Sequence, residues 1–340
     1  MKDHAVGSGA GEVPRPFRAV LVTGASGLVG SHVVRALLAG QLAEEARIGD
    51  SVVGWRAVSQ RGVTMVRCLT RQPTPELLQL ERDHAGRVKL CIGDMLGPAC
   101  RTTVAPHLTA DGGCDGLINC AAHYRWWSRS TEMYGALNEV AVSELMKLAL
   151  EAKVTQIVHV STILAMGCPP GGWGSPTRPL QPDTPPGPTA SLYARSKAAG
   201  DAAVLRLAAE TGLPACVVAL ACVVGADRRL VSGPQDDVMR IADLVRGKVP
   251  AALGHDTVFT YIGVRDAAAA IAAALLRGRP GRRYLVGNQR MTTAEFYDTL
   301  ARLSGTPAPT WRVPVGVAAA WAAAAAGWAA LTGVAPQLVQ

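Results

Sequence analysis

The chain has 340 residues, 49% of them apolar, so it can bury one large core or a core with a smaller lobe attached. Charged residues make up only 18%, which argues against extensive disorder. The net charge of +8 comes from scattered lysines and arginines, and only 5% of residues are aromatic, so nucleic-acid binding is disfavoured.

The first segment, residues 1–16, is rich in Gly, Pro and polar residues and has no apolar stretch typical of a signal peptide, so we expect a flexible leader. The eight cysteines form no CxxC pair, and the histidines show no zinc-ligand spacing, so no metal site is expected. Several cysteines lie in apolar runs, which favours a reducing compartment. We therefore expect a cytoplasmic protein.

Short apolar runs typical of buried strands alternate with helical patterns. Ala19–Val22 is the first run, and it is followed by apolar residues at helical spacing between Val29 and Leu38. The later runs are 63–69, 88–92, 116–120, 157–161 and 215–224. This alternation predicts an α/β fold of the Rossmann type, a doubly wound parallel sheet, with a smaller C-terminal substrate lobe.

The pattern also divides the chain. We expect residues 17–222, completed by about 260–287, to form the dinucleotide-binding domain, and residues 223–259 and 288–336 to form a substrate-binding lobe. Residues 40–62 are expected to loop out, and 44–48 are not predicted as a strand. Gly167–Pro188 is dense in Pro and Gly, which indicates a surface loop, and Thr292-x-x-Glu295 is a capping box for a helix that Gly305 ends.

The tail from Val313 to Val334 is apolar and alanine-rich, and its length approaches that of a membrane span. Pro314, three glycines and the many alanines favour a buried or a lobe-packing helix instead. Contact of this tail with a membrane surface is the less favoured alternative. The oligomeric state is open, with a homodimer as one alternative.

The segment Thr23–Gly30 (TGASGLVG) follows a predicted strand and opens a predicted helix, which is the context of a dinucleotide-binding fingerprint. Gly24 would permit the tight turn, Gly27 would let the backbone approach a pyrophosphate, and Gly30 would allow close helix–strand packing. The helix N-terminus would offer N–H groups to the anion. An ordinary glycine-rich turn is the alternative. The candidate contacts are Gly24, Ser26, Gly27, Leu28, Val29 and Gly30.

The residue at the end of the second predicted strand of the sheet indicates whether NAD or NADP binds. An acidic residue there would bind the ribose of NAD, whereas an arginine accommodates the 2′-phosphate of NADP. Val66–Arg71 contains no acid and ends in Arg71, with Arg67 as a candidate helper. This favours NADP(H), with a solvated loop charge as the alternative interpretation of Arg71.

Tyr193-Ala194-Arg195-Ser196-Lys197 is a YxxxK motif, whose spacing places Tyr193 and Lys197 on one helical face. A tyrosine needs help to act as an acid–base at neutral pH, and we expect the Lys197 ammonium and a positive nicotinamide ring to lower its pKa together. Before it, the predicted strand 157–161 leads into Thr162, whose hydroxyl could hold a substrate carbonyl.

These motifs resemble the extended short-chain dehydrogenase/reductase family, also called the NAD-dependent epimerase/dehydratase family, from about Arg18 to Pro336. The resemblance implies that Asp94, with Met95 beside it, contacts the adenine. It also implies that Cys120, Ala121 and Ala122 line the cofactor site, that Asn138 supports the active-site helix, and that Thr162, Tyr193 and Lys197 are catalytic.

The segments HVSTILAMG and AHYRW are similar to the dihydroflavonol-reductase-like and 3β-hydroxysteroid-dehydrogenase-like branch. Met166 and Ala219-Leu220 stand where that family's sugar-nucleotide epimerases have polar groups, which favours a largely apolar substrate. The aromatic stretch is expected to wall the substrate pocket or to form a structural cluster. Its members are His123, Tyr124, Trp126 and Trp127.

The sequence therefore predicts an NADP(H)-dependent oxidoreductase that transfers a hydride between nicotinamide and a carbonyl or secondary alcohol of a small molecule. One alternative is an NDP-sugar epimerase or dehydratase on the same scaffold, for which Arg228 and Arg229 are the only candidate diphosphate anchors. The other is a non-catalytic NADP-binding partner protein, which the presence of all three catalytic side chains disfavours.

Overall fold

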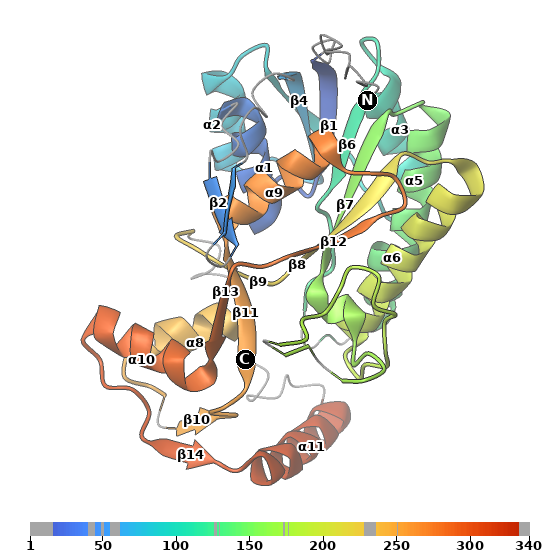
Figure 1. The fold of residues 1–340 in the computed structure, drawn as a ribbon. Helices are drawn as coiled ribbons and strands as arrows, with labels where there is room; N and C mark the ends of the chain where they lie inside the picture. Colours follow the sequence, from blue (N-terminus) through green and yellow to red (C-terminus); the bar gives the residue numbers. More distant parts are fainter. Residues whose placement is uncertain are drawn as a thin grey trace, which may run out of the picture.

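Seven parallel strands form the central sheet of the protein (Figure 1). The computed structural model describes residues 16–39, 45–48, 51–54, 62–125, 128, 130–172, 174–175, 177–227, 236–249 and 251–332. The sheet order is β12-β8-β7-β6-β1-β4-β5, and every neighbouring pair runs parallel. The strands are β1 (Phe17–Thr23), β4 (Val63–Thr70), β5 (Val88–Ile92), β6 (Gly116–Asn119), β7 (Gln156–Thr162), β8 (Ala215–Leu220) and β12 (Arg283–Val286).

Helices cover both faces of this sheet, as the doubly wound prediction requires (Figure 1). On one face, α1 (Leu28–Ala39), α2 (Pro75–Asp83) and α9 (Val264–Arg277) pack over a buried cluster that includes Val22, Val33 and Ile271. On the other face, α3 (Ala105–Thr109), α5 (Ala141–Glu151) and α6 (Leu192–Thr211) pack over a cluster that includes Leu21 and Leu145. The Rossmann-type α/β fold is confirmed.

A smaller group of elements lies at one end of the sheet (Figure 1). Its strands form two small sheets, ordered β13-β11-β9 and β10-β14. These strands are β9 (Cys222–Val224), β10 (Ala251–Leu253), β11 (Val258–Gly263), β13 (Gln289–Thr292) and β14 (Trp311–Val313), and the helices are α8 (Asp236–Val245), α10 (Thr293–Ser304) and α11 (Val315–Thr332). The capping box predicted for α10 is present, and Gly305 ends the helix with a φ of 74°.

The structure corrects one predicted strand and adds a strand that was not predicted. The run 215–224 is not one strand: it breaks at Ala221, so that β8 stays in the central sheet while β9 pairs with β11. Residues 45–48, not predicted as a strand, form β2 (Glu45–Ile48), which pairs with β3 (Ser51–Gly54) as an antiparallel hairpin. This hairpin pairs with no strand of the central sheet, so β4 is the neighbour of β1.

The prediction that the tail forms a buried helix is also wrong for the side chains that the structure describes. Helix α11 does form, but Trp321 and Trp328 are 64% and 66% exposed, and most of its other described side chains are exposed. An alanine-rich helix offers little side-chain area to bury, which explains its weak packing on the lobe. No helix among the described residues has the length and hydropathy needed to cross a membrane.

Candidate functional site

The turn between β1 and α1 has the backbone geometry that a dinucleotide fingerprint needs. Gly24 has a φ of +64°, which favours glycine, and a Cβ there would lie 2.8 Å from the backbone of Ala121. A Cβ on Gly30 would clash with the Gly24 carbonyl oxygen, so the helix can approach the turn only with glycine at this position. Gly27 is exposed, and the N-terminus of α1 offers its N–H groups beside it.

This turn lies where the strand order reverses. From β1 the chain builds outward to β4 and β5 on one side and to β6, β7, β8 and β12 on the other. In open α/β sheets, ligands bind in the crevice beyond the carboxyl ends of the strands at such a switch point. Thr23 is paired with Asn119 and with Leu69, so the segments after β4 and β6 flank the turn.

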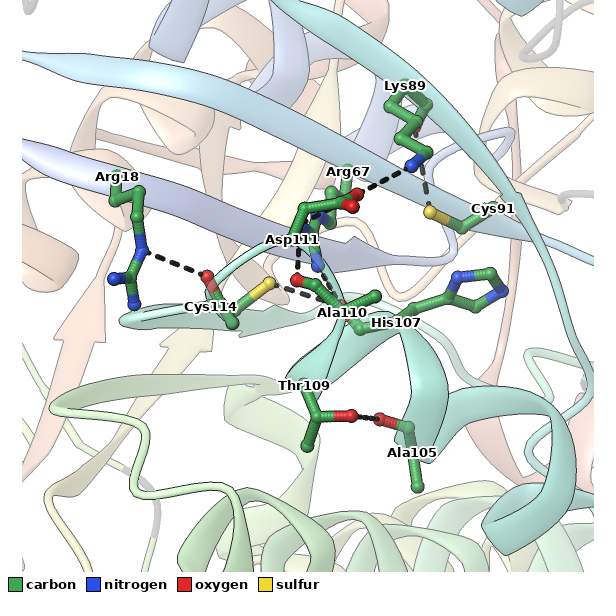
Figure 2. Close-up of polar contacts among 11 residues, drawn as sticks. Arg18, Arg67, Lys89, Cys91, Ala105, His107, Thr109, Ala110, Asp111 and Cys114 are labelled. Carbon is green, nitrogen blue, oxygen red and sulfur yellow. Dashed lines mark hydrogen bonds and ion pairs between the residues drawn. The ribbon is translucent and has the colours of Figure 1, made fainter.

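Arg67, within β4, and Arg71, just after it, have different surroundings. Arg71 is exposed just beyond the carboxyl end of the strand, and the described segment 70–75 around it holds no acidic residue. Arg67 is 2% exposed and donates to the carbonyl oxygens of His107 (2.6 Å) and Ala110 (2.8 Å), with Asp111 at 3.6 Å (Figure 2).

The expectation that Arg67 helps to hold the cofactor phosphate is therefore wrong. Its guanidinium satisfies the carbonyl groups at the end of α3, below the crevice, and would have to leave them to reach a ligand.

The segments after β5 and β6 supply the other candidate cofactor residues. Asp94 is half-buried, and its Oδ1 accepts from the Leu96 amide at 3.0 Å. Met95 is 4% exposed and lies in the core, so only its backbone can face a ligand. Cys120 and Ala121 are half-buried and Ala122 is exposed, beside the Gly24 turn.

The three candidate catalytic residues come from β7 and α6. Ser191 caps α6 by accepting from the Ala194 amide, which places Tyr193 and Lys197 in the first two turns of the helix. Both are buried, at 8% and 1% exposure. Thr162 ends β7, and its hydroxyl oxygen accepts from the Leu164 amide at 3.3 Å.

The charge states of this pair differ from the prediction. Burial, followed by the nearby Tyr124 and Asp201, raises the pKa of Tyr193 well above its usual range, so Lys197 alone does not produce the expected lowering in the ligand-free protein. The Lys197 Nζ donates to the Val160 carbonyl at 2.9 Å and not to the Tyr193 phenol. Burial also lowers the pKa of Lys197, although Asp201 and Cys120 oppose that shift.

Asn138 ties the catalytic helix to the loop after β6. It lies in a π-helical turn (Ala136–Val140), where its Oδ1 accepts from the His123 amide at 2.7 Å. Its Nδ2 donates to the His123 carbonyl at 3.1 Å and to the Ser196 hydroxyl at 2.9 Å. The side chain thus fixes the loop 120–123 relative to α6, the supporting position that the family resemblance implies.

The aromatic stretch is divided between two contacts. The Tyr124 ring packs edge-on against Tyr193, with centroids 4.9 Å apart, so it lies beside the candidate catalytic phenol. The His123 ring packs edge-on against Tyr134 at 4.8 Å, as in a structural cluster. Trp126 and Trp127 lie outside the described residues, as do Arg228 and Arg229.

Two residues thought to make the pocket apolar lie in the core instead. Met166 is 1% exposed, and its sulfur is 3.3 Å from Nη1 of Arg283. Leu220 is 4% exposed and packs within the cluster beneath α1 and α9. Neither side chain offers a surface to a ligand, so they carry no information on substrate polarity.

Sequence reasoning missed a set of buried polar side chains beside Lys197. Asn119, His159 and Asp201 are at most 2% exposed and contact one another in series. The hydroxyl of Ser161, the neighbour of Thr162, donates to Asp201 at 2.8 Å and is not available to a substrate. The one available signal was that Asn119 and His159 are polar residues within otherwise apolar strands.

Comparison with known proteins decides the family. Residues 20–287 match the model described as the NAD dependent epimerase/dehydratase family. The chain belongs to this family. The resemblance stated from the motifs is thereby confirmed, and the family is a group of redox-active enzymes that use a nicotinamide dinucleotide.

Two curated relatives and one solved structure are similar over most or part of the chain. "Sterol demethylase protein B" of Methylococcus capsulatus is 28% identical over 295 residues, which cover 86% of this chain and 77% of the relative. "Putative dihydroflavonol 4-reductase" of Synechocystis is 26% identical over 60% of this chain and 58% of its own length. A dTDP-glucose 4,6-dehydratase from Bacillus anthracis, solved with NAD, is 20% identical, has a TM-score of 0.65 and covers 87% of this chain and 85% of its own; it supports the fold alone.

Proposed function

We propose that this protein is an NADP(H)-dependent oxidoreductase that interconverts a carbonyl and a secondary alcohol on a largely apolar small molecule. The observation that carries the proposal is the grouping of Thr162, Tyr193 and Lys197 at the end of β7 and the start of α6. β7 is paired with β6, and the end of β6 flanks the Gly24 turn. The elements outside the central sheet, within residues 223–259 and 288–336, would form the substrate lobe.

The residues present fit a dinucleotide. The space that a Cβ on Gly24 or Gly30 would fill is kept open by glycine, and the N-terminus of α1 would receive the pyrophosphate. Asp94 would contact the adenine, Arg71 the 2′-phosphate, and Lys197 the nicotinamide ribose. When bound, the nicotinamide supplies or accepts the hydride.

Thr162, Tyr193 and Lys197 would bind the reacting oxygen of the substrate and exchange a proton with it. Thr162 would donate a hydrogen bond to the substrate oxygen and so fix its position. Because burial raises the pKa of Tyr193, the phenol keeps its proton at neutral pH and can donate it to that oxygen as a carbonyl is reduced. The ammonium of Lys197 would stabilise the phenolate that results. In the oxidation direction the same groups would act in reverse.

The proposal of an apolar substrate is supported by the names of the relatives, one of which refers to a sterol and the other to a dihydroflavonol. The test is to assay a panel of steroid-like ketones, aryl ketones and β-keto compounds, with turnover measured as the oxidation of NADPH. We expect turnover of at least one ketone, and we expect no thermal stabilisation by UDP-glucose or dTDP-glucose. Stabilisation by an NDP-sugar of a few kcal/mol, as a saturating ligand gives, together with a silent ketone panel, would favour the epimerase or dehydratase alternative.

Cofactor preference tests the role of Arg71. We expect NADPH to bind at least about tenfold more tightly than NADH, because the guanidinium can pair with the 2′-phosphate that only NADPH carries. Arg71→Ala should bring the two affinities together by weakening NADPH alone, as measured by fluorescence titration. Arg82→Ala is the matched control, since Arg82 is an exposed arginine on α2. Equal affinities in the unmodified protein would contradict the assignment.

A further inference from the structure

A row of buried polar side chains crosses the sheet beside the catalytic helix. Thr23 on β1 is paired with Asn119 on β6, and Asn119 is paired with His159 on β7, so the three side chains lie at one level of the sheet. All three are 0% exposed, and the row ends at Asp201 on α6, which is 2% exposed. The family's motifs and the proposed mechanism leave this row without a role.

The hydrogen bonds of the row have a defined direction. The Thr23 hydroxyl oxygen accepts from the Ala121 amide at 3.2 Å, and the hydroxyl donates to Oδ1 of Asn119 at 2.5 Å. The Asn119 amide nitrogen therefore faces Nδ1 of His159 at 3.0 Å. An amide nitrogen only donates, so Nδ1 accepts and the ring proton lies on Nε2, which is directed to Oδ1 of Asp201 at 3.4 Å.

The row ends on a carboxylate that lacks a full set of partners. Oδ2 of Asp201 accepts from the Ser161 hydroxyl at 2.8 Å, whereas Oδ1 has no hydrogen bond of good geometry among the described residues. A buried carboxylate in that state needs a cation. Lys197 precedes Asp201 by one helical turn, and its Nζ lies 3.4 Å from the same Nε2 of His159 that Oδ1 approaches.

Among the titratable groups around Lys197, Asp201 is the one that most favours its charged form. Burial lowers the pKa of Lys197, and Asp201 is the largest opposing influence, followed by the Cys120 thiol after β6. Burial raises the pKa of Cys120 to about 12, so this thiol is neutral at physiological pH. On the β7 side, burial and Lys197 lower the pKa of His159, so its ring is neutral and adds no charge. Tyr193, on the same helix, is kept as a neutral phenol by burial.

We propose that Asp201 is a positioning residue: its carboxylate, which accepts from Ser161 and faces the His159 ring, fixes the Lys197 ammonium as its buried counter-charge beside the dinucleotide site. The inference deepens the proposed function, because it rests on the role of Lys197 there. The same row reaches the Ala121 amide through Asn119 and Thr23. The loop that would line the cofactor is thus joined, by one series of buried polar contacts, to the carboxylate beside the lysine that would bind the ribose.

The test is the titration of Lys197 in the ligand-free protein. The chain has six lysines, so ¹³C labelling of the lysine ε-carbons gives six NMR signals, and the one absent in Lys197→Met is assigned to Lys197. Asp201→Asn keeps the shape of the side chain and removes its charge. We expect it to lower the titration midpoint of Lys197 by about one pH unit or more, since the loss of a nearby opposite charge shifts a pKa by roughly that amount.

The control is Asp115→Asn, which removes a carboxylate whose oxygens accept from the Arg18 and Ala19 amides at the start of β1. It should leave the Lys197 midpoint unchanged. A shift of the Lys197 midpoint by less than about 0.3 pH units in Asp201→Asn would overturn the proposal. A shift in Asp115→Asn as large as that in Asp201→Asn would overturn it as well.

A measurement on the unmodified protein keeps the proposal testable if Asp201→Asn does not fold. The ¹⁵N spectrum of the His159 ring should show a neutral imidazole protonated on Nε2 between pH 6 and 8. A ring protonated on Nδ1, or on both nitrogens, would overturn the hydrogen-bond direction on which the inference depends. Neither experiment uses cofactor or substrate. A silent ketone panel would therefore count against the proposed function alone, whereas an unmoved Lys197 midpoint would count against Asp201 alone.

Discussion

Tyr193→Phe is expected to lower turnover on an active ketone by at least about a hundredfold, the usual contribution of general acid–base catalysis. The substitution deletes the phenolic oxygen and keeps the ring, so the edge-on packing against Tyr124 is preserved. NADPH affinity and melting temperature should change little, and measuring both alongside steady-state kinetics separates lost chemistry from lost structure. Near-normal turnover would remove Tyr193 from the mechanism and require another proton donor.

The neighbouring residues provide controls with different expected patterns. Lys197→Met should lower both turnover and NADPH affinity, because the ammonium is proposed to stabilise the phenolate and to bind the ribose. Thr162→Ala should lower turnover with little effect on NADPH affinity. Ser161 cannot replace Thr162, because its hydroxyl is already donated to the buried carboxylate of Asp201.

The parts of the site that could be predicted from sequence are those encoded by local signals. The glycines of the turn after β1 are needed because Gly30 packs against the Gly24 carbonyl and Gly24 lies close to the Ala121 backbone. Their spacing is visible in TGASGLVG. Tyr193 and Lys197 are likewise one helical turn apart, so their shared face follows from helix geometry alone. The parallel sheet followed from apolar runs alternating with helical patterns.

The parts that could not be predicted depend on which face or depth a residue occupies. Arg67 and Arg71 are four residues apart, the first within β4 and the second just beyond its carboxyl end. The register of β4 against β5 and the position of α3 place the first at buried carbonyl groups and leave the second at the crevice. In the sequence, Met166 and Leu220 favoured an apolar substrate, but packing places both side chains in the core. The row from Thr23 to Asp201 exists only because β1, β6 and β7 bring distant residues to one level.

The helix α11 shows a different limit. Its apolar composition indicated burial, but composition does not say whether a helix of mostly alanine has enough side-chain area to bury against the lobe. The structure leaves Trp321, Trp328 and Leu331 largely exposed. Hydropathy alone therefore predicted that a helix forms and failed to predict its packing.

Gly30→Ala is expected to weaken NADPH binding by at least about tenfold and to lower stability by about 2–3 kcal/mol. The added Cβ would clash with the carbonyl oxygen of Gly24 and would also lie 2.8 Å from its carbonyl carbon. Both are backbone atoms that cannot rotate away, so either α1 must move from the sheet or the turn must open. Each movement displaces the N–H groups proposed to bind the pyrophosphate, which is why affinity and stability should fall together.

The matched control for Gly30→Ala is Gly135→Ala. Gly135 ends the helical turn α4 (Glu132–Gly135), and no atom lies within 4 Å of the position that its Cβ would occupy. Alanine is the better helix former, so this change should leave stability unchanged or raise it slightly, with NADPH affinity unaffected. Calorimetry and NADPH titration of both variants measure the two effects. If Gly30→Ala bound NADPH as well as Gly135→Ala does, the turn after β1 would not be the pyrophosphate site, because the substitution would have moved its backbone without consequence for the ligand.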